Sequence, residues 1–159
     1  IALANKDTPS VLALSRQGVP ANRTDTEQNK SALGAYVLAE AEGGARKVTL
    51  LGTGAEIGIA LEARETLQKA GIPTAVISVP CFELFDAQDA AYRSAVLGTP
   101  GGVRVAVEAA IGQGWDKYLG DNGSFVGMTG FGASGPAGQL FEHFGINAEN
   151  VVAAAKSRL

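Results

Sequence analysis

Short apolar runs alternate with amphipathic stretches along most of the chain, and this alternation predicts its elements. Apolar runs of four to six residues predict strands at Val11–Leu14, Ala35–Leu38, Lys47–Leu51, Thr74–Val79, Val103–Val107 and Ser124–Met128. Apolar residues at steps of three and four predict five helices. They span about Ala55–Ala70, the segment from Asp86 to about Leu97, Trp115–Leu119, Ala137 to Gly145, and the residues from Asn147 onward. Such an order indicates an α/β domain with mostly parallel strands covered on both faces.

Polar residues at the helix ends predict where several helices begin. We expect Asp86 to cap the helix that ends near Leu97, with Asp89 in its first turn. Ser134 and Asn147 are the expected caps of the last two helices. Gly71 after the long helix supplies a left-handed terminating position.

The first 30 residues follow a different pattern. Ile1–Lys6 is typical of the last turns of a helix, which Asp7-Thr8-Pro9 would break. Arg16–Lys30 is polar and aperiodic, which predicts a loop or an interdomain linker. Since the sequence begins at Ile1 and its only methionine is Met128, we expect a processed product, a trimmed chain or a fragment of a longer protein.

Composition excludes several classes of function. The net charge is −3 and no Lys/Arg cluster occurs, which argues against nucleic acid as a partner. One cysteine and one histidine allow no intramolecular disulfide and no Cys- or His-rich metal site. No apolar run reaches 18 residues and no signal peptide is visible, so we expect no membrane partner and a cytoplasmic location.

Three features at predicted strand ends could carry chemistry. Gly52-Thr53-Gly54 lies where a dinucleotide fingerprint would, but its third glycine is one residue late and Glu56 would repel a pyrophosphate, so a tight turn is favoured. Arg16 could bind a phosphate or form a surface ion pair. Glu108 could act as a general base, but a structural cap or ion pair is favoured.

The remaining reactive residues favour structural roles. His143 lies on the polar face of its helix, and Cys81 is expected to be a buried, inert thiol. Asp86 and Asp89 have a metal-like spacing, but N-capping explains both. The residues alone therefore predict a domain without a complete catalytic set.

Six motifs in register resemble the C-terminal region of bacterial-type transketolases. They are Leu14-Ser15-Arg16-Gln17, Gly34–Leu38, Gly52–Glu56, Phe85–Arg93, Val105–Ala109 and Phe131–Ala137. The resemblance implies a three-layer domain with a five-stranded mixed sheet containing one antiparallel strand. It also implies that residues 1–17 end a pyrimidine-binding domain, that 18–33 form a linker, and that 34–159 form the C-terminal domain.

The same resemblance implies a function for the parent protein. Transketolases are homodimers that use thiamine diphosphate and Mg²⁺ to move a two-carbon ketol unit between sugar phosphates. The arginine of the Leu-Ser-Arg-Gln motif, here Arg16, would bind the phosphate of the substrate. The cofactor and metal ligands would lie in the missing N-terminal domains, so we expect neither group on this chain and no activity from the chain alone.

Two alternatives remain open at this point. The chain could be the corresponding domain of another thiamine-dependent enzyme, such as a 2-oxo acid dehydrogenase or deoxyxylulose-phosphate synthase, although Phe85–Arg93 favours transketolase. It could also be a stand-alone module that dimerises or binds a partner without chemistry.

Overall fold

A five-stranded sheet forms the centre of the molecule. The computed structural model describes all residues from Ile1 to Leu159. The strands are β1 (Tyr36–Ala39), β2 (Val48–Gly52), β3 (Thr74–Ser78), β4 (Val103–Ile111) and β5 (Gly123–Met128), in the spatial order β1-β3-β2-β4-β5. Only β1 runs antiparallel to its neighbour, so the predicted α/β class with a mostly parallel, mixed five-stranded sheet is confirmed.

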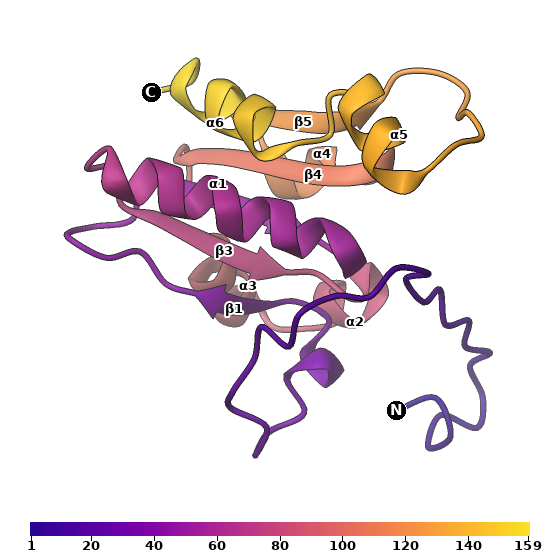
Figure 1. The fold of residues 1–159 in the computed structure, drawn as a ribbon. Coiled ribbons are helices and arrows are strands. Elements are labelled where there is room, and N and C mark those ends of the chain that lie inside the picture. Colours follow the sequence, from indigo (N-terminus) through magenta and orange to yellow (C-terminus); the bar gives the residue numbers. More distant parts are fainter.

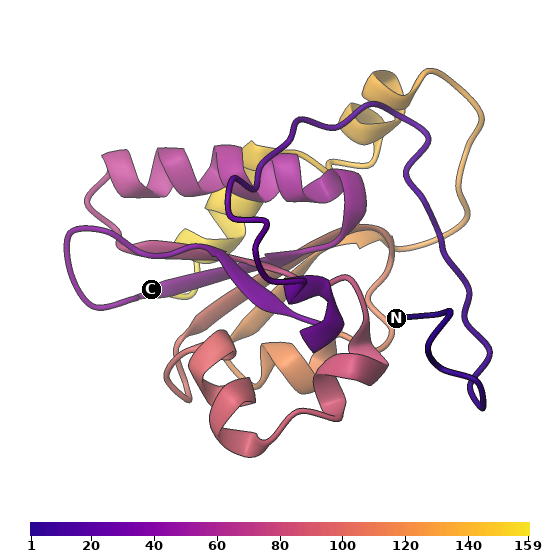
Figure 2. The ribbon, with the colours of Figure 1, turned by 90° about the horizontal axis from the view of Figure 1, so that it is seen from below.

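Helices cover both faces of this sheet and make three layers (Figures 1 and 2). One face carries α1 (Ile57–Lys69) and α6 (Ala148–Lys156), while the opposite face carries α2 (Phe82–Asp86), α3 (Ala90–Leu97) and α4 (Asp116–Leu119). The short α5 (Ala137–His143) lies at one end of the sheet. Two 3₁₀ turns, η1 (Lys30–Leu33) and η2 (Gly54–Glu56), complete the elements.

Alternating side chains of the strands build two separate cores. Val48, Leu50 and Val105 pack with α1 and α6, whereas Leu51 and Ala106 pack on the other face with α2–α4. Because successive strand residues point to opposite faces, a continuous apolar strand serves both layers at once. The second core is aromatic, and its largest buried side chain is Trp115.

Most predicted helices are confirmed, but the helix that ends at Leu97 starts later than expected, and a separate short helix precedes it. The chain forms α2 up to Asp86, turns, and starts α3 at Ala90. The prediction that Asp86 caps the helix was wrong, because Asp89 performs this role by accepting a hydrogen bond from the Tyr92 N–H at 2.7 Å. Asp86 instead binds the side chains of Lys117 and Tyr118 on α4.

The N-terminal predictions were wrong for two segments. Ile1–Lys6 forms only isolated turns, and Val11–Leu14 is extended chain that pairs with no strand. Val11 and Leu14 are 95% and 83% exposed, so these apolar side chains lack the neighbouring strand and the helix cover that a buried strand requires. Residues 16–29 contain no helix or strand, as expected for a loop, and η1 begins at Lys30.

The remaining differences are small. β4 continues four residues past the predicted end, and β1 begins one residue later than expected. Ser134 makes no cap to α5, which Pro136 precedes, whereas Asn147 caps α6 as predicted by accepting the Asn150 N–H at 3.0 Å. None of the helices is both long and apolar enough to cross a bilayer.

Candidate functional site

The carboxyl ends of β2 and β4 lie side by side and form the edge of the sheet where α/β domains usually bind ligands. The turn after β2 passes through Gly54, whose φ of +54° favours glycine. A Cβ at Gly54 would lie 3.1 Å from Oγ of Ser15. The segment containing Ser15 and Arg16 therefore crosses directly over this turn, although it is some 40 positions distant in the sequence.

Arg16 borders a hollow of about 470 Å³ at the same end of the molecule. Gln17 and residues Gly135, Pro136, Ala137 and Leu140, at the start of α5, form the rest of its lining. The Arg16 guanidinium makes no ion pair and no hydrogen bond within the chain, so the surface ion pair considered from the sequence does not form. An unpaired guanidinium beside such a hollow is free to bind a carboxylate or phosphate.

Two carboxyl groups, Glu56 and Glu108, lie beside this edge, and the sequence did not predict that the charge of Glu108 acts on Glu56. Glu56 is only 9% exposed, and its Oε1 accepts a hydrogen bond from the Ala109 N–H at 3.3 Å. Glu108 Oε2 accepts one from Trp115 Nε1 at 2.7 Å. Burial, with a smaller contribution from the Glu108 charge, raises the pKa of Glu56. The general-base role of Glu108 has no support here, since its carboxylate is held by an indole.

The only sequence signal for Glu56 was its place directly after the Gly52-Thr53-Gly54 turn. That position brings it between the ends of two neighbouring parallel strands, where water is excluded. The Gly52-Thr53-Gly54 turn thus leads the chain from β2 to a buried carboxyl just before α1.

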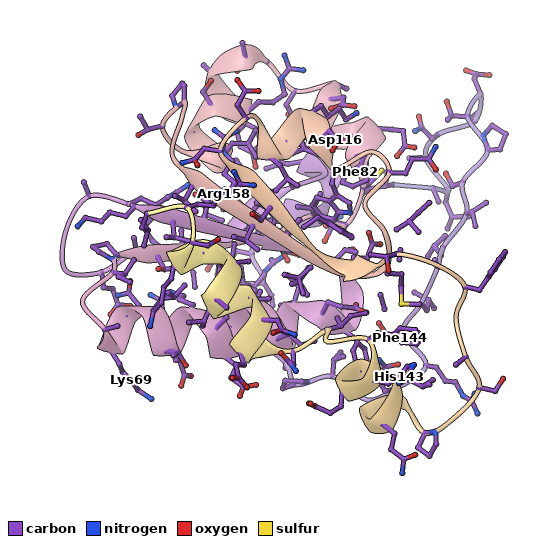
Figure 3. All side chains as sticks on the ribbon, turned by 90° about the horizontal axis from the view of Figure 1, so that it is seen from above. Lys69, Phe82, Asp116, His143, Phe144 and Arg158 are labelled. Atoms are coloured by element: carbon purple, nitrogen blue, oxygen red, sulfur yellow. The ribbon has the colours of Figure 1, made fainter.

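The other reactive residues are dispersed. His143 is exposed on α5, where its ring stacks edge-on at 4.8 Å against Phe144 (Figure 3). Cys81 is half-buried, not fully buried as predicted, and its thiol donates a hydrogen bond to Glu83 at 3.3 Å. An apolar pocket of about 220 Å³ between the end of β4 and α5 has Met128, Phe141 and Phe144 among its lining residues.

The chain's own residues do not fit a metal–diphosphate cofactor. No group of three or more His, Cys, Asp or Glu side chains is arranged to hold a metal ion, and the carboxyls of Glu56 and Glu108 accept hydrogen bonds from Ala109 and Trp115. We therefore derive no chemical step through a bound cofactor from these residues.

Together these features define an α/β domain of mostly parallel strands with an unpaired arginine beside a hollow at the carboxyl ends of its strands. The sequence model of the transketolase-like TK C-terminal domain matches residues 34–147. The chain therefore belongs to the transketolase C-terminal domain family.

Relatives and solved structures agree with this assignment. The chain is 58% identical over 157 residues to the transketolase of Sinorhizobium medicae, covering 98% of this chain and 22% of that protein. It is 44% identical to the chloroplastic transketolase of Solanum tuberosum, covering 98% of this chain and 21% of that protein. The chain thus spans about a fifth of the length of these relatives.

The fold is that of solved transketolases. A transketolase structure from Leishmania mexicana superposes with a TM-score of 0.73 at 39% identity, covering 80% of this chain and 18% of that one. A structure titled "Split gene transketolase, inactive beta4 tetramer" shares the fold with a TM-score of 0.68 at 23% identity, covering 91% of this chain and 48% of that one.

Proposed function

We propose that this chain serves as the C-terminal part of a transketolase that transfers a two-carbon ketol unit from a ketose phosphate to an aldose phosphate. The observation that carries the proposal is the 58% identity to a transketolase along 98% of the chain. The parent would use thiamine diphosphate and Mg²⁺ bound by its other domains, act as a homodimer, and work in the pentose phosphate pathway in the cytoplasm.

Within this parent, residues 1–17 form the end of the pyrimidine-binding domain and residues 34–159 form the C-terminal domain. Residues 18–33 link the two domains. The start of the C-terminal domain at Gly34 is supported by the family match, which begins at that residue. The assignment of residues 1–17 to the preceding domain is supported by the exposed apolar side chains of Val11 and Leu14, which need a neighbouring structure to cover them.

Arg16 binds the phosphate group of the sugar substrate. Its guanidinium has no partner in the chain and borders an open hollow, so it can form a bidentate pair with phosphate oxygens. The chain's own contribution to the reaction is then to hold and orient the end of the substrate farthest from the transferred carbons.

Replacing Arg16 in the full-length transketolase tests this role. Arg16→Ala should raise KM for phosphorylated sugars roughly 10–150-fold, because a charge-assisted contact is worth about 1.5–3 kcal/mol. KM for an unphosphorylated aldehyde acceptor should not change. Arg158→Ala, which removes a charge that only bonds Ser124 Oγ, is the matched control. An unchanged KM for sugar phosphates would remove Arg16 from the site.

The chain by itself is expected to be inactive. The support is that its residues offer no ligand set for the metal, and its relatives are four to five times longer. A ketol-transfer assay on the purified chain with added thiamine diphosphate and Mg²⁺ should show no rate above buffer. A measurable rate would contradict the assignment of the chemistry to other domains.

A further inference from the structure

A second polar hollow lies at the opposite end of the sheet from Arg16. It occupies about 470 Å³ between the end of α3, the start of β4 and the turn that leads into β5. This is the amino edge of the parallel strands, since β4 begins at Val103 and β5 at Gly123. Its size is within the range of small-molecule sites.

Two arginines border this hollow, and the charge of Arg93 also acts on the nearby Asp86 carboxylate. Arg93 lies on α3 and Arg104 on β4, and neither belongs to an ion pair. Asp121 is the only acidic residue in the lining. Arg46 lies nearby, with Nη1 about 3.1 Å from where a Cβ on Gly98 would be, but Glu40 balances its charge at 2.6 Å. The lining therefore carries a net positive charge.

Hydrogen bonds hold the guanidinium of Arg104 in place but do not use all of its N–H donors. It donates to the carbonyls of Leu97 at 3.1 Å, Tyr118 at 2.9 Å and Gly98 at 3.2 Å. These bonds use three of its five N–H groups and leave one on each terminal nitrogen. Burial lowers the pKa of Arg104, and the nearby Arg46 charge adds to this, so a bound anion would relieve unfavourable positive charge.

The backbone adds further donors at the rim. The N–H groups of Gly101, Asp121 and Asn122 make no hydrogen bond within the chain. The Asn122 side chain donates to the Gly101 carbonyl at 3.3 Å and ties the two loops together. Exposed N–H groups of successive turn residues, set beside guanidinium groups, are a common arrangement for binding anions.

We propose that this hollow binds the phosphate group of a small metabolite through Arg93, Arg104 and the free backbone N–H groups of the two loops. The site is separate from the substrate site proposed at Arg16, because it lies at the other edge of the sheet. Arg93 and Arg104 contribute charge, and the loop amides complete the coordination of the phosphate oxygens.

Titration of the ¹⁵N-labelled chain with inorganic pyrophosphate tests the proposal. We expect saturable chemical-shift changes centred on the amides of Gly101, Asp121 and Asn122 and on Arg104 Nε, with a Kd of about 1 mM or lower. Changes spread over the whole surface without saturation, or no changes, would overturn it.

Charge variants separate a built site from general attraction. Arg93→Gln should weaken binding about tenfold or more, and the fold should tolerate it because the Arg93 side chain makes only one hydrogen bond, to the backbone carbonyl of Asp86. Asp121→Asn should tighten binding, because it removes the carboxylate of the lining, which would repel the phosphate. Lys69→Gln, at a side chain that is 79% exposed on α1, should have no effect. Equal affinity in Arg93→Gln and the unaltered chain would refute the site.

Discussion

The burial of one side chain, that of Glu56, makes the stability of the folded protein depend on pH. Glu56 is surrounded by the ends of β2 and β4, and desolvation raises its pKa. The folded chain therefore holds the proton of Glu56 more tightly than the unfolded chain does. The stability contributed by this group is fully present below the unfolded pKa and is lost as pH rises through the raised folded pKa.

Glu56→Gln should consequently stabilise the protein at pH 8 and have little effect near pH 4. The amide keeps the acceptor for the Ala109 N–H and carries no charge to bury. Urea unfolding at both pH values measures the difference. Glu65→Gln, at an exposed i,i+4 pair with Lys69, is the control. An equal effect of Glu56→Gln at both pH values would contradict the role of desolvation.

Gly34 shows how close backbone approach selects a residue type. Its φ is +80°, and a Cβ there would lie 2.1 Å from the Phe85 nitrogen and 2.5 Å from the Cys81 carbonyl oxygen. Neither backbone atom can rotate away, so the second core would have to open. Gly71 has a similar φ of +74°, but a Cβ built there would have no atom within 4 Å. Comparing the two glycines therefore distinguishes the cost of backbone strain from the cost of a steric clash.

Gly34→Ala should therefore cost clearly more stability than Gly71→Ala. The left-handed conformation alone costs about 1–2 kcal/mol for alanine, and this is the full effect expected at Gly71. The collision at Gly34 adds to that strain. Thermal unfolding of both variants measures the two costs, and equal losses would show that the backbone near Phe85 shifts freely.

At the scale of elements, capping determines where α2 ends and α3 begins. Asp86 and Asp89 are both good N-cap residues, and a sequence pattern cannot choose between them. The side chains of α4 decide the choice, since Lys117 and Tyr118 bind Asp86 and leave Asp89 to receive the Tyr92 N–H. The polar contact between helices thus selects the helix start.

Asp89→Ala should destabilise the protein by about 1 kcal/mol, because it removes the cap of α3. Asp89→Asn should remain close to the unaltered protein, because the amide oxygen can still accept the Tyr92 N–H. Chemical denaturation of both variants provides the measurement. If the two variants lose the same stability, the charge of Asp89 and not its hydrogen bond is the important property.

At the scale of the whole molecule, the chain consists of a packed domain and an extended N-terminal segment. Figure 1 shows this segment running outside the layers of the domain. Leu3, Val11 and Leu12 are 100%, 95% and 69% exposed, so they contribute little to the stability of either core. Apolar side chains exposed in this way are typical of an interaction surface.

Deleting residues 1–13 should leave the thermal midpoint within about 2 °C of the full chain, since a loss of 1 kcal/mol shifts a domain of this size by about 2–4 °C. Calorimetry measures the midpoint. The deletion spares Ser15, which lies against Gly54. A larger fall would mean that the exposed segment is part of the cooperative unit.

Local sequence patterns are enough to predict the class of fold and the family. Alternating apolar runs and amphipathic stretches, with Gly71 and Asn147 at helix ends, are local signals, and each is read from neighbouring residues. Motifs such as Phe85–Arg93 carried the resemblance to transketolases, which the family match over residues 34–147 confirmed.

The tertiary structure alone decided which residues share an edge and which apolar runs become strands. The charge of Glu108 acts on Glu56 because β2 and β4 are neighbouring parallel strands, and Ser15 lies against Gly54 because the N-terminal segment passes over the turn after β2. Val11–Leu14 has the composition of a strand but pairs with none, since a strand requires a neighbour as well as a pattern. Contacts between distant segments depend on packing, and a local pattern does not contain that information.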